Sequence, residues 1–128
     1  MTRLAYVDTS CYVAVAFGEP GAAEVADALE SFDERISSNL LEAELRAAFA
    51  RENVTFEPRV LGGLGWILPD RPLSPEFAQV LGAGYARGAD LWHLAVALYL
   101  AEIPGDMTFL TLDERQRELA RYLGFRTE

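Results

Sequence analysis

The chain has 128 residues and a mass of 14.1 kDa, which is enough for one hydrophobic core and too little for two. Hydrophobic residues make up 51% of it and charged residues 24%, so disordered, collagen-like and low-complexity proteins are excluded. The net charge of −9 excludes nucleic-acid binding through bulk positive charge, and because all eleven cations are arginine, mechanisms that need a lysine are excluded too.

The first half of the chain predicts two strands and three helices. Residues 4–7 form a short apolar run that is typical of a buried strand. A helix over residues 11–17, with Ser10 as its N-cap, is expected to end at the Gly-Glu-Pro-Gly sequence of residues 18–21. The other predicted elements are a helix at 22–29, a weak strand at 35–38 and a strong helix at 40–51.

The second half begins with an irregular segment, residues 56–75, in which 65–69 is compatible with a short strand. Ser74 and Pro75 predict the N-cap and first position of a helix that runs to about residue 85. The remaining elements are an apolar, fully buried helix from Asp90 to 101, a strand at 107–112, an amphipathic helix at 114–123 with Gly124 as its C-cap, and a last edge strand at 125–127.

Strands alternate with helices along the whole chain, and no internal repeat or linker interrupts them. This alternation predicts an α/β fold with three layers, α/β/α, around a mainly parallel central sheet. We expect residues 1–128 to form one domain.

The single cysteine, Cys11, cannot form an internal disulfide and is expected to be a small buried side chain in a reducing compartment. Asp8 follows closely after the N-terminus, so the first residues do not resemble a signal peptide. The longest strongly apolar stretch, residues 91–101, is too short to span a bilayer. We therefore expect a soluble, cytoplasmic protein without membrane association.

Glu44 stands out among the acids because of its helical neighbours. The side chains three and four residues away are Leu40, Leu41, Ala47 and Ala48. Glu44 is therefore expected to project from the buried face of its helix, whereas Glu42 faces Arg46 and is expected to be an ordinary surface acid. A buried carboxylate needs an arginine, a hydrogen-bond network or a metal ion as its partner.

Three aspartates lie where a parallel sheet binds ligands. Asp8 and Asp113 directly follow predicted strands, whose carboxyl ends form the ligand-binding edge of such sheets. Asp90 begins the most apolar helix. N-capping alone would also explain Asp90 and Asp113, and an arginine partner would explain Glu44. Together the four acids favour an all-oxygen site for Mg²⁺ or Mn²⁺, whereas one His and one Cys are too few for an ordinary zinc site.

Each of the four acids lies in a short motif. The motifs are Tyr6-Val7-Asp8-Thr9-Ser10, Ser37-Ser38-Asn39-Leu40-Leu41-Glu42-Ala43-Glu44-Leu45-Arg46, Ala89-Asp90-Leu91-Trp92-His93-Leu94-Ala95 and Phe109-Leu110-Thr111-Leu112-Asp113. In this order and at this spacing they resemble the PIN-domain ribonucleases, and most closely the VapC toxins of bacterial toxin–antitoxin pairs. The segment 56–86 matches only in general character, and Trp92 stands where a smaller residue is expected.

The resemblance implies a PIN-like fold and an endoribonuclease that depends on Mg²⁺ or Mn²⁺ and leaves 5′-phosphate and 3′-hydroxyl ends. It implies that Asp8 and Asp90 are the nearest metal ligands. Glu44 and Asp113 are expected to complete the cluster, bind a second ion or orient water. It also implies a homodimer and a cognate VapB-like antitoxin, for which the apolar helix faces near residues 13–29 are expected to form a groove.

Other polar residues are candidates for supporting roles. Ser10 and Thr111 could hydrogen-bond the carboxylates or metal-bound waters, although an N-cap and a plain strand residue explain them equally well. His93, one turn after Asp90, could be a general base, but a core histidine with one hydrogen bond explains it better. Arg46 and Arg87 could contact RNA phosphate.

Other functions are compatible with parts of this pattern. Phosphatases of the haloacid dehalogenase type and phospho-receiver domains also use an aspartate at a strand end, but both need the lysine that this chain lacks. A PIN-like module that only binds proteins would be expected to lack one or more of the acids. A PIN nuclease of RNA processing, without an antitoxin, differs from a toxin only in its genomic context.

Overall fold

The computed structural model of the chain describes residues 2–128, which form a four-stranded sheet and six α-helices. The strands are β1 (Leu4–Val7), β2 (Glu34–Ser38), β3 (Leu64–Ile67) and β4 (Thr108–Leu110). The helices are α1 (Thr9–Ala16), α2 (Ala22–Glu30), α3 (Leu40–Arg51), α4 (Ser74–Ala83), α5 (Gly88–Leu100) and α6 (Glu114–Tyr122), with two short 3₁₀ helices, η1 (Pro58–Leu61) and η2 (Pro104–Asp106).

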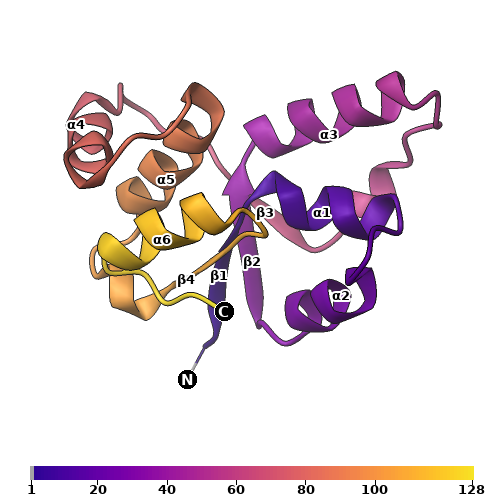
Figure 1. Cartoon of the computed structure of the whole chain (residues 1–128), viewed down its shortest axis with the longest axis horizontal. Helices are drawn as coiled ribbons and strands as arrows, with labels where there is room; N and C mark the ends of the chain where they lie inside the picture. The colour runs from indigo at the N-terminus through magenta and orange to yellow at the C-terminus, as the bar shows by residue number, and fades with distance from the viewer. Residues whose placement is uncertain (1) are drawn as a thin grey trace.

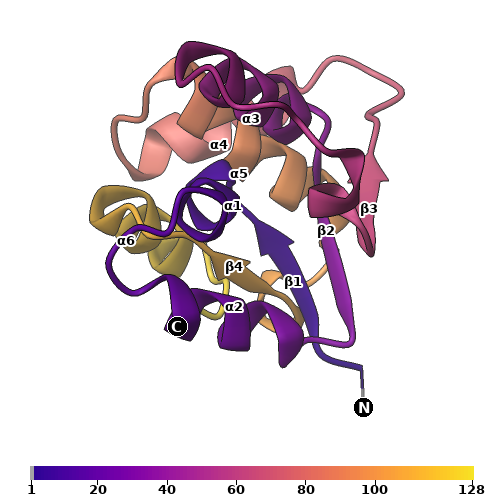
Figure 2. The same cartoon turned by 90° about the vertical axis from the view of Figure 1, so that its right-hand side faces the viewer.

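All four strands are parallel, in the order β3-β2-β1-β4 (Figure 2). β1 is central, so that Ala5 pairs with Arg35 of β2 on one side and with Thr108 of β4 on the other. Parallel neighbours must be joined by crossovers, and the helices of these crossovers cover both faces of the sheet. Helices α1, α2 and α3 lie on one face and α4, α5 and α6 on the other (Figure 1). The predicted three-layer α/β/α fold is confirmed.

Alternate side chains of β1 enter the two halves of the core, as the period of two in a strand requires. Tyr6 packs with Leu94 of α5 in one half. Val7 packs with Cys11 of α1 and Leu41 of α3 in the other. Cys11 is a free, wholly buried thiol, as predicted, and this burial, together with the charge of Asp8, raises its pKa to about 12.

Two predicted N-caps are wrong, with consequences for the site. α1 begins at Thr9, so Asp8 rather than Ser10 holds the N-cap position, and the Ser10 hydroxyl turns back to Asp8 instead. α5 begins at Gly88, after an extended Arg87, so Asp90 lies in its first turn and is not its cap. The predicted helix at 40–51 is correct at both ends.

The end of the chain forms less strand than the pattern predicts. β4 stops at Leu110, and the segment 125–127 contributes only one parallel bridge, between Arg126 and Thr108. α5 is also less buried than predicted, because Leu100 at its C-terminal end is 39% exposed. Within residues 2–128, every helix lacks the length or the apolar character needed to cross a membrane.

Candidate active site

The four candidate acids lie around one cleft at the carboxyl edge of the sheet, where parallel sheets bind ligands. Asp8 follows β1, Asp113 follows β4, Glu44 projects from α3 and Asp90 from the first turn of α5. The cleft has a volume of about 490 Å³, and all four acids line it together with Thr9, Ser10, Arg51 and Arg87. The structure therefore brings together the residues that the sequence selects.

Asp8 is the most enclosed of the acids, with 5% of its surface exposed. Its Oδ2 accepts hydrogen bonds from the Ser10 hydroxyl, at 2.8 Å, and the Thr111 hydroxyl, at 2.9 Å. The Ser10 hydroxyl also accepts the backbone N–H of Leu112 at 3.0 Å, which ties the start of α1 to the end of β4. Asp8 is thus held in one orientation, and its Oδ1 has no hydrogen-bond donor among residues 2–128.

Glu44 is held by two side chains from other elements. The Thr9 hydroxyl donates to Glu44 Oε1 at 2.7 Å, and His93 Nε2 lies 2.9 Å from the same oxygen. Burial raises the pKa of Glu44, but the hydrogen bonds from His93 and Thr9 outweigh it, so that the pKa lies below its usual range. Glu44 is therefore ionised at neutral pH, with Oε1 committed to these two donors.

The tautomer of His93 follows from the partners of Tyr6. The backbone N–H of Ser38 donates to the Tyr6 hydroxyl oxygen at 3.1 Å, and that oxygen lies 2.7 Å from His93 Nδ1. Burial raises the pKa of Tyr6 far above its usual value, so the phenol keeps its proton and donates it to Nδ1. Nε2 must then carry the imidazole proton, which it donates to Glu44.

The prediction of His93 as a core histidine with a single hydrogen bond is therefore wrong. The side chain is buried, as predicted, but its two ring nitrogens contact Tyr6, Thr9 and Glu44. His93 thereby links the sheet core to the acidic cleft. Because both nitrogens are engaged, His93 is not a free ligand or base.

The predicted contrast between Glu44 and Glu42 lies in their surroundings and not in the exposed fraction of their side chains. Their side chains are 34% and 27% exposed, respectively. The difference lies in their partners, because Glu42 pairs with Arg46 at 2.6 Å on the same helix, as predicted. Glu44 has no arginine partner within residues 2–128, and its neighbour His93 comes from α5.

Asp90 and Asp113 face the same cleft with different local contacts. Asp113 Oδ1 accepts the backbone N–H of Gln116 at 2.8 Å, so the interpretation of Asp113 as the N-cap of α6 is confirmed. Asp90 is partly buried and lies close to two like charges. Burial raises the pKa of Asp90, and the negative charges of Asp8 and Asp113 raise it further.

The donor set fits a hard divalent cation. Its members are carboxylate oxygens, which Mg²⁺ and Mn²⁺ prefer, and burial together with the charges of Asp8 and Asp113 raises the pKa of Asp90 more than His93 and Arg87 lower it. The residue types suit such an ion, but their side chains do not form a closed coordination site. Within the described part of the chain, no three His, Cys, Asp or Glu side chains already stand close enough to hold an ion between them.

The family model of the PIN domain matches residues 5–122. The chain belongs to the PIN domain family. PIN domains are in general nucleases that act on RNA, and they typically use a divalent metal. No curated protein and no solved structure matches the chain.

Three polar residues of this PIN domain were missed by sequence reasoning. Tyr6 and Thr9 flank Asp8 and contact His93 and Glu44, and buried Gln116 lies 3.1 Å from the Thr111 hydroxyl through its side-chain oxygen. The period of two in β1 places Tyr6 and Asp8 on one side of the strand, and this signal could have found Tyr6. The position of Gln116, three residues after an N-cap aspartate, is the corresponding signal for Gln116.

The PIN domain also accommodates Trp92, where a smaller residue was expected. The indole N–H of Trp92 donates to Ser38 Oγ at 2.7 Å, and its ring packs against Phe77 of α4. Ser38 is the residue whose backbone N–H binds the Tyr6 hydroxyl. Trp92 therefore belongs to the series of hydrogen bonds that runs through Ser38, Tyr6 and His93 to Glu44.

Proposed function

We propose that this PIN domain is a Mg²⁺- or Mn²⁺-dependent endoribonuclease that hydrolyses RNA phosphodiester bonds. The observation that carries the proposal is the cleft in which Asp8, Asp90 and Asp113 meet, where burial and the two neighbouring carboxylates raise the pKa of Asp90 although Arg87 lies beside it. Such an arrangement is unfavourable in the apo protein and becomes favourable when a divalent ion is bound.

The residues have distinct proposed roles. Asp8 and Asp90 are the nearest candidate ligands, and Asp113 offers its second oxygen while the first caps α6. Glu44 presents Oε2 to complete the cluster, bind a second ion or orient water. A bound ion would supply activated water at neutral pH and neutralise charge on the phosphate. Ser10 and Thr111 orient Asp8, and His93 orients Glu44.

Removal of the metal tests this proposal. Purified protein incubated with structured RNA is expected to cut it with Mg²⁺ or Mn²⁺, to stop when a chelator is added, and to resume when the ion is restored in excess. The products should carry 5′-phosphate ends, which a 5′-phosphate-dependent exonuclease detects. Cleavage that continues unchanged in the chelator would contradict the proposal, because the acids alone would then suffice.

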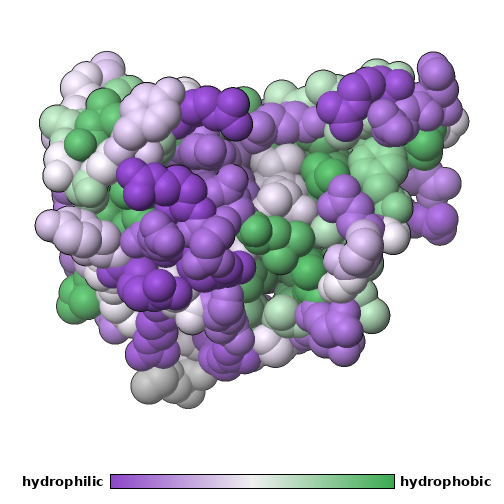
Figure 3. Space-filling model, in the orientation of Figure 1, coloured by the Kyte–Doolittle hydropathy of each residue, from purple (hydrophilic) through white to green (hydrophobic). Residues whose placement is uncertain are grey.

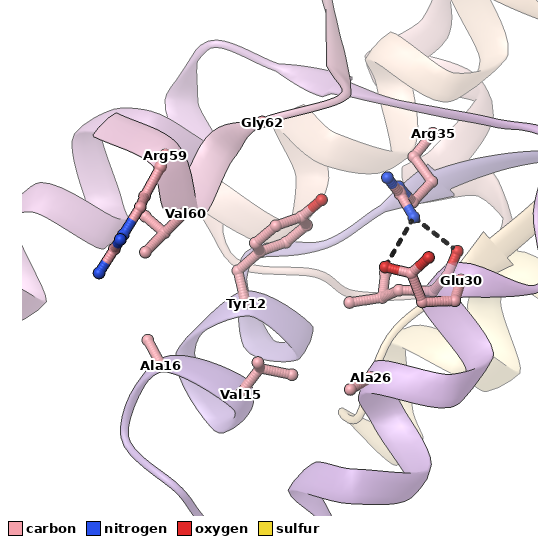
Figure 4. Close-up of a pocket in the computed structure, with 10 residues that line it drawn as sticks. Tyr12, Val15, Ala16, Ala26, Glu30, Arg35, Arg59, Val60 and Gly62 are labelled. Carbon is pink, nitrogen blue, oxygen red and sulfur yellow. Dashed lines mark hydrogen bonds and ion pairs between the residues drawn. The ribbon is translucent and has the colours of Figure 1, made fainter. Parts of the chain in front are cut away.

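We propose further that this nuclease is a VapC-type toxin whose VapB-like antitoxin docks beside α1 and α2. Hydrophobic side chains gather over α1 (Figure 3). A cavity of about 270 Å³ lies between α1, α2 and η1 (Figure 4). Tyr12 and Val15 line its apolar part, and at its edge lie Arg35, paired with Glu30, and Arg59, paired with Glu57. The apolar lining of this groove suits a segment with apolar side chains.

Binding to the product of the neighbouring gene tests the toxin assignment. The two proteins are expected to co-purify, and the complex is expected to cut RNA less than the free nuclease. We expect a homodimer, the proposed state of a cytoplasmic VapC-type toxin, and light scattering measures its mass. A monodisperse nuclease with no affinity for the neighbouring gene product would instead support a role in RNA processing without an antitoxin.

A further inference from the structure

A second, smaller cavity of about 170 Å³ adjoins the acidic cleft. Arg87, Asp90 and Asp113 line both, so the two cavities adjoin at these residues. Tyr85 and Arg115 line the smaller cavity but not the cleft. A molecule whose phosphate lies at the acids could therefore extend into this neighbouring space.

Tyr85 provides an aromatic surface at the edge of this cavity. It lies in the connection between α4 and α5, and it is 69% exposed, although most large side chains of the domain are buried. Single-stranded RNA is bound mainly by bases that stack on exposed aromatic rings, since every base has a face that can stack.

Arg87 and Arg115 add positive charge beside an otherwise acidic site. Arg87 makes no ion pair within residues 2–128, and Arg115 has only a loose pair with Glu118, at 3.8 Å between exposed side chains. The guanidinium of Arg115 lies against the backbone of Gly84, where a Cβ atom would come within 2.9 Å of its Nη2. The absence of a side chain at Gly84 therefore allows Arg115 to lie beside Tyr85.

We propose that this cavity is a nucleotide subsite, in which the base next to the cleaved phosphodiester stacks on Tyr85 and an adjoining phosphate binds Arg87 and Arg115. The proposal rests on the proposed ribonuclease function and names the part of the RNA that this surface takes. Stacking tolerates any base, so the subsite contributes affinity and placement rather than strict sequence choice. It also explains how a chain of net charge −9 holds a polyanion near its acids.

Binding of a fluorescein-labelled oligouridylate, measured by anisotropy in the presence of chelator, tests the subsite without requiring cleavage. Tyr85→Ala is expected to raise the Kd about tenfold, while Tyr85→Phe, which keeps the ring, leaves it unchanged. Tyr122→Ala is the matched control, because Tyr122 is an exposed tyrosine, at 77%, that lines neither cavity. Arg115→Gln should weaken binding and reduce its dependence on salt.

The outcomes separate the subsite from the ribonuclease. Metal-dependent cleavage with equal binding by the Tyr85→Ala and unchanged chains would overturn the subsite alone, as would an unchanged chain that does not bind the oligouridylate. Binding that depends on Tyr85 without cleavage in any metal would support the subsite and contradict the proposed catalysis. Where cleavage occurs, Tyr85→Ala should raise KM and leave kcat nearly constant.

Discussion

Replacement of Asp90 by asparagine is expected to reduce metal-dependent RNA cleavage by at least about a hundredfold, since the loss of even an outer partner of a metal site typically costs about 10- to 100-fold. The Asp90 carboxylate is close to Asp8 and Asp113 and has no hydrogen-bond partner within residues 2–128. Asparagine has nearly the same shape, so the substitution removes a charge and a candidate ligand without breaking a contact.

The same substitution is expected to raise the thermal stability of the metal-free protein. Because burial and the two neighbouring charges raise the pKa of Asp90, its ionised form is less favourable in the folded state than in the unfolded state. The Asp90→Asn variant should therefore have the higher Tm at neutral pH. This difference should vanish below about pH 3.9, the ordinary pKa of aspartate, where both states are protonated. Mg²⁺ should raise the Tm of the unchanged chain more than that of the variant.

Asp27→Asn is the matched control for both measurements, because it removes the same charge from an exposed position of α2. Gel-based cleavage assays and thermal denaturation with and without Mg²⁺ are the measurements. If the two variants cleave equally well, Asp90 has no part in catalysis. A lower Tm of metal-free Asp90→Asn would show that the carboxylate stabilises the apo fold, contrary to the geometry described above.

Substitution of His93 by glutamine and by asparagine is expected to separate the contact of Nε2 with Glu44 from the contact of Nδ1 with Tyr6. The glutamine amide nitrogen lies near the place of Nε2 and can donate to Glu44, whereas the asparagine oxygen lies near the place of Nδ1 and can accept from Tyr6. We expect His93→Gln to retain most activity and His93→Asn to lose about 10- to 100-fold, because only the asparagine variant releases Glu44.

Stability and metal binding distinguish this role from a general loss of packing. Each variant leaves one polar group without its partner, at a cost of about 1–3 kcal/mol, so their free energies of unfolding should be similar while their activities differ. Titration with Mn²⁺ should show weaker binding for the asparagine variant. Equal activities of the two variants would contradict a role for His93 in holding Glu44.

The fold was predictable because its signals are local. Apolar runs mark β1 and β4, and helical periodicity marks α3 to within a residue. The wrong N-caps arise from contacts between distant segments. Ser10 does not cap α1 because its hydroxyl serves Asp8 and Leu112, and no pattern near Ser10 records the partner that is 102 residues away.

The acids of the site were predictable from their positions, but the side chains that hydrogen-bond to them were not. Strand ends selected Asp8 and Asp113, and an apolar helical face selected Glu44, although the exposed fraction of the side chain does not separate Glu44 from Glu42. The Tyr6 contact to His93 joins residues 87 apart in sequence, and Tyr6 lies within a run that indicates only a buried strand. Such a network exists only once the sheet and α5 have packed together.

The central place of β1 has a consequence for the order in which the protein forms during synthesis. β1 is made before the other three strands, yet the strand on one of its sides, β4, is made after them, and Thr111 binds Asp8 across 103 residues. A nascent chain that ends before β4 holds Asp8, Glu44 and Asp90 but leaves one edge of β1 unpaired. The cleft is therefore complete only when β4 and α6 have left the ribosome, so a translation product that ends before β4 would carry three of the acids without the cleft that all four line.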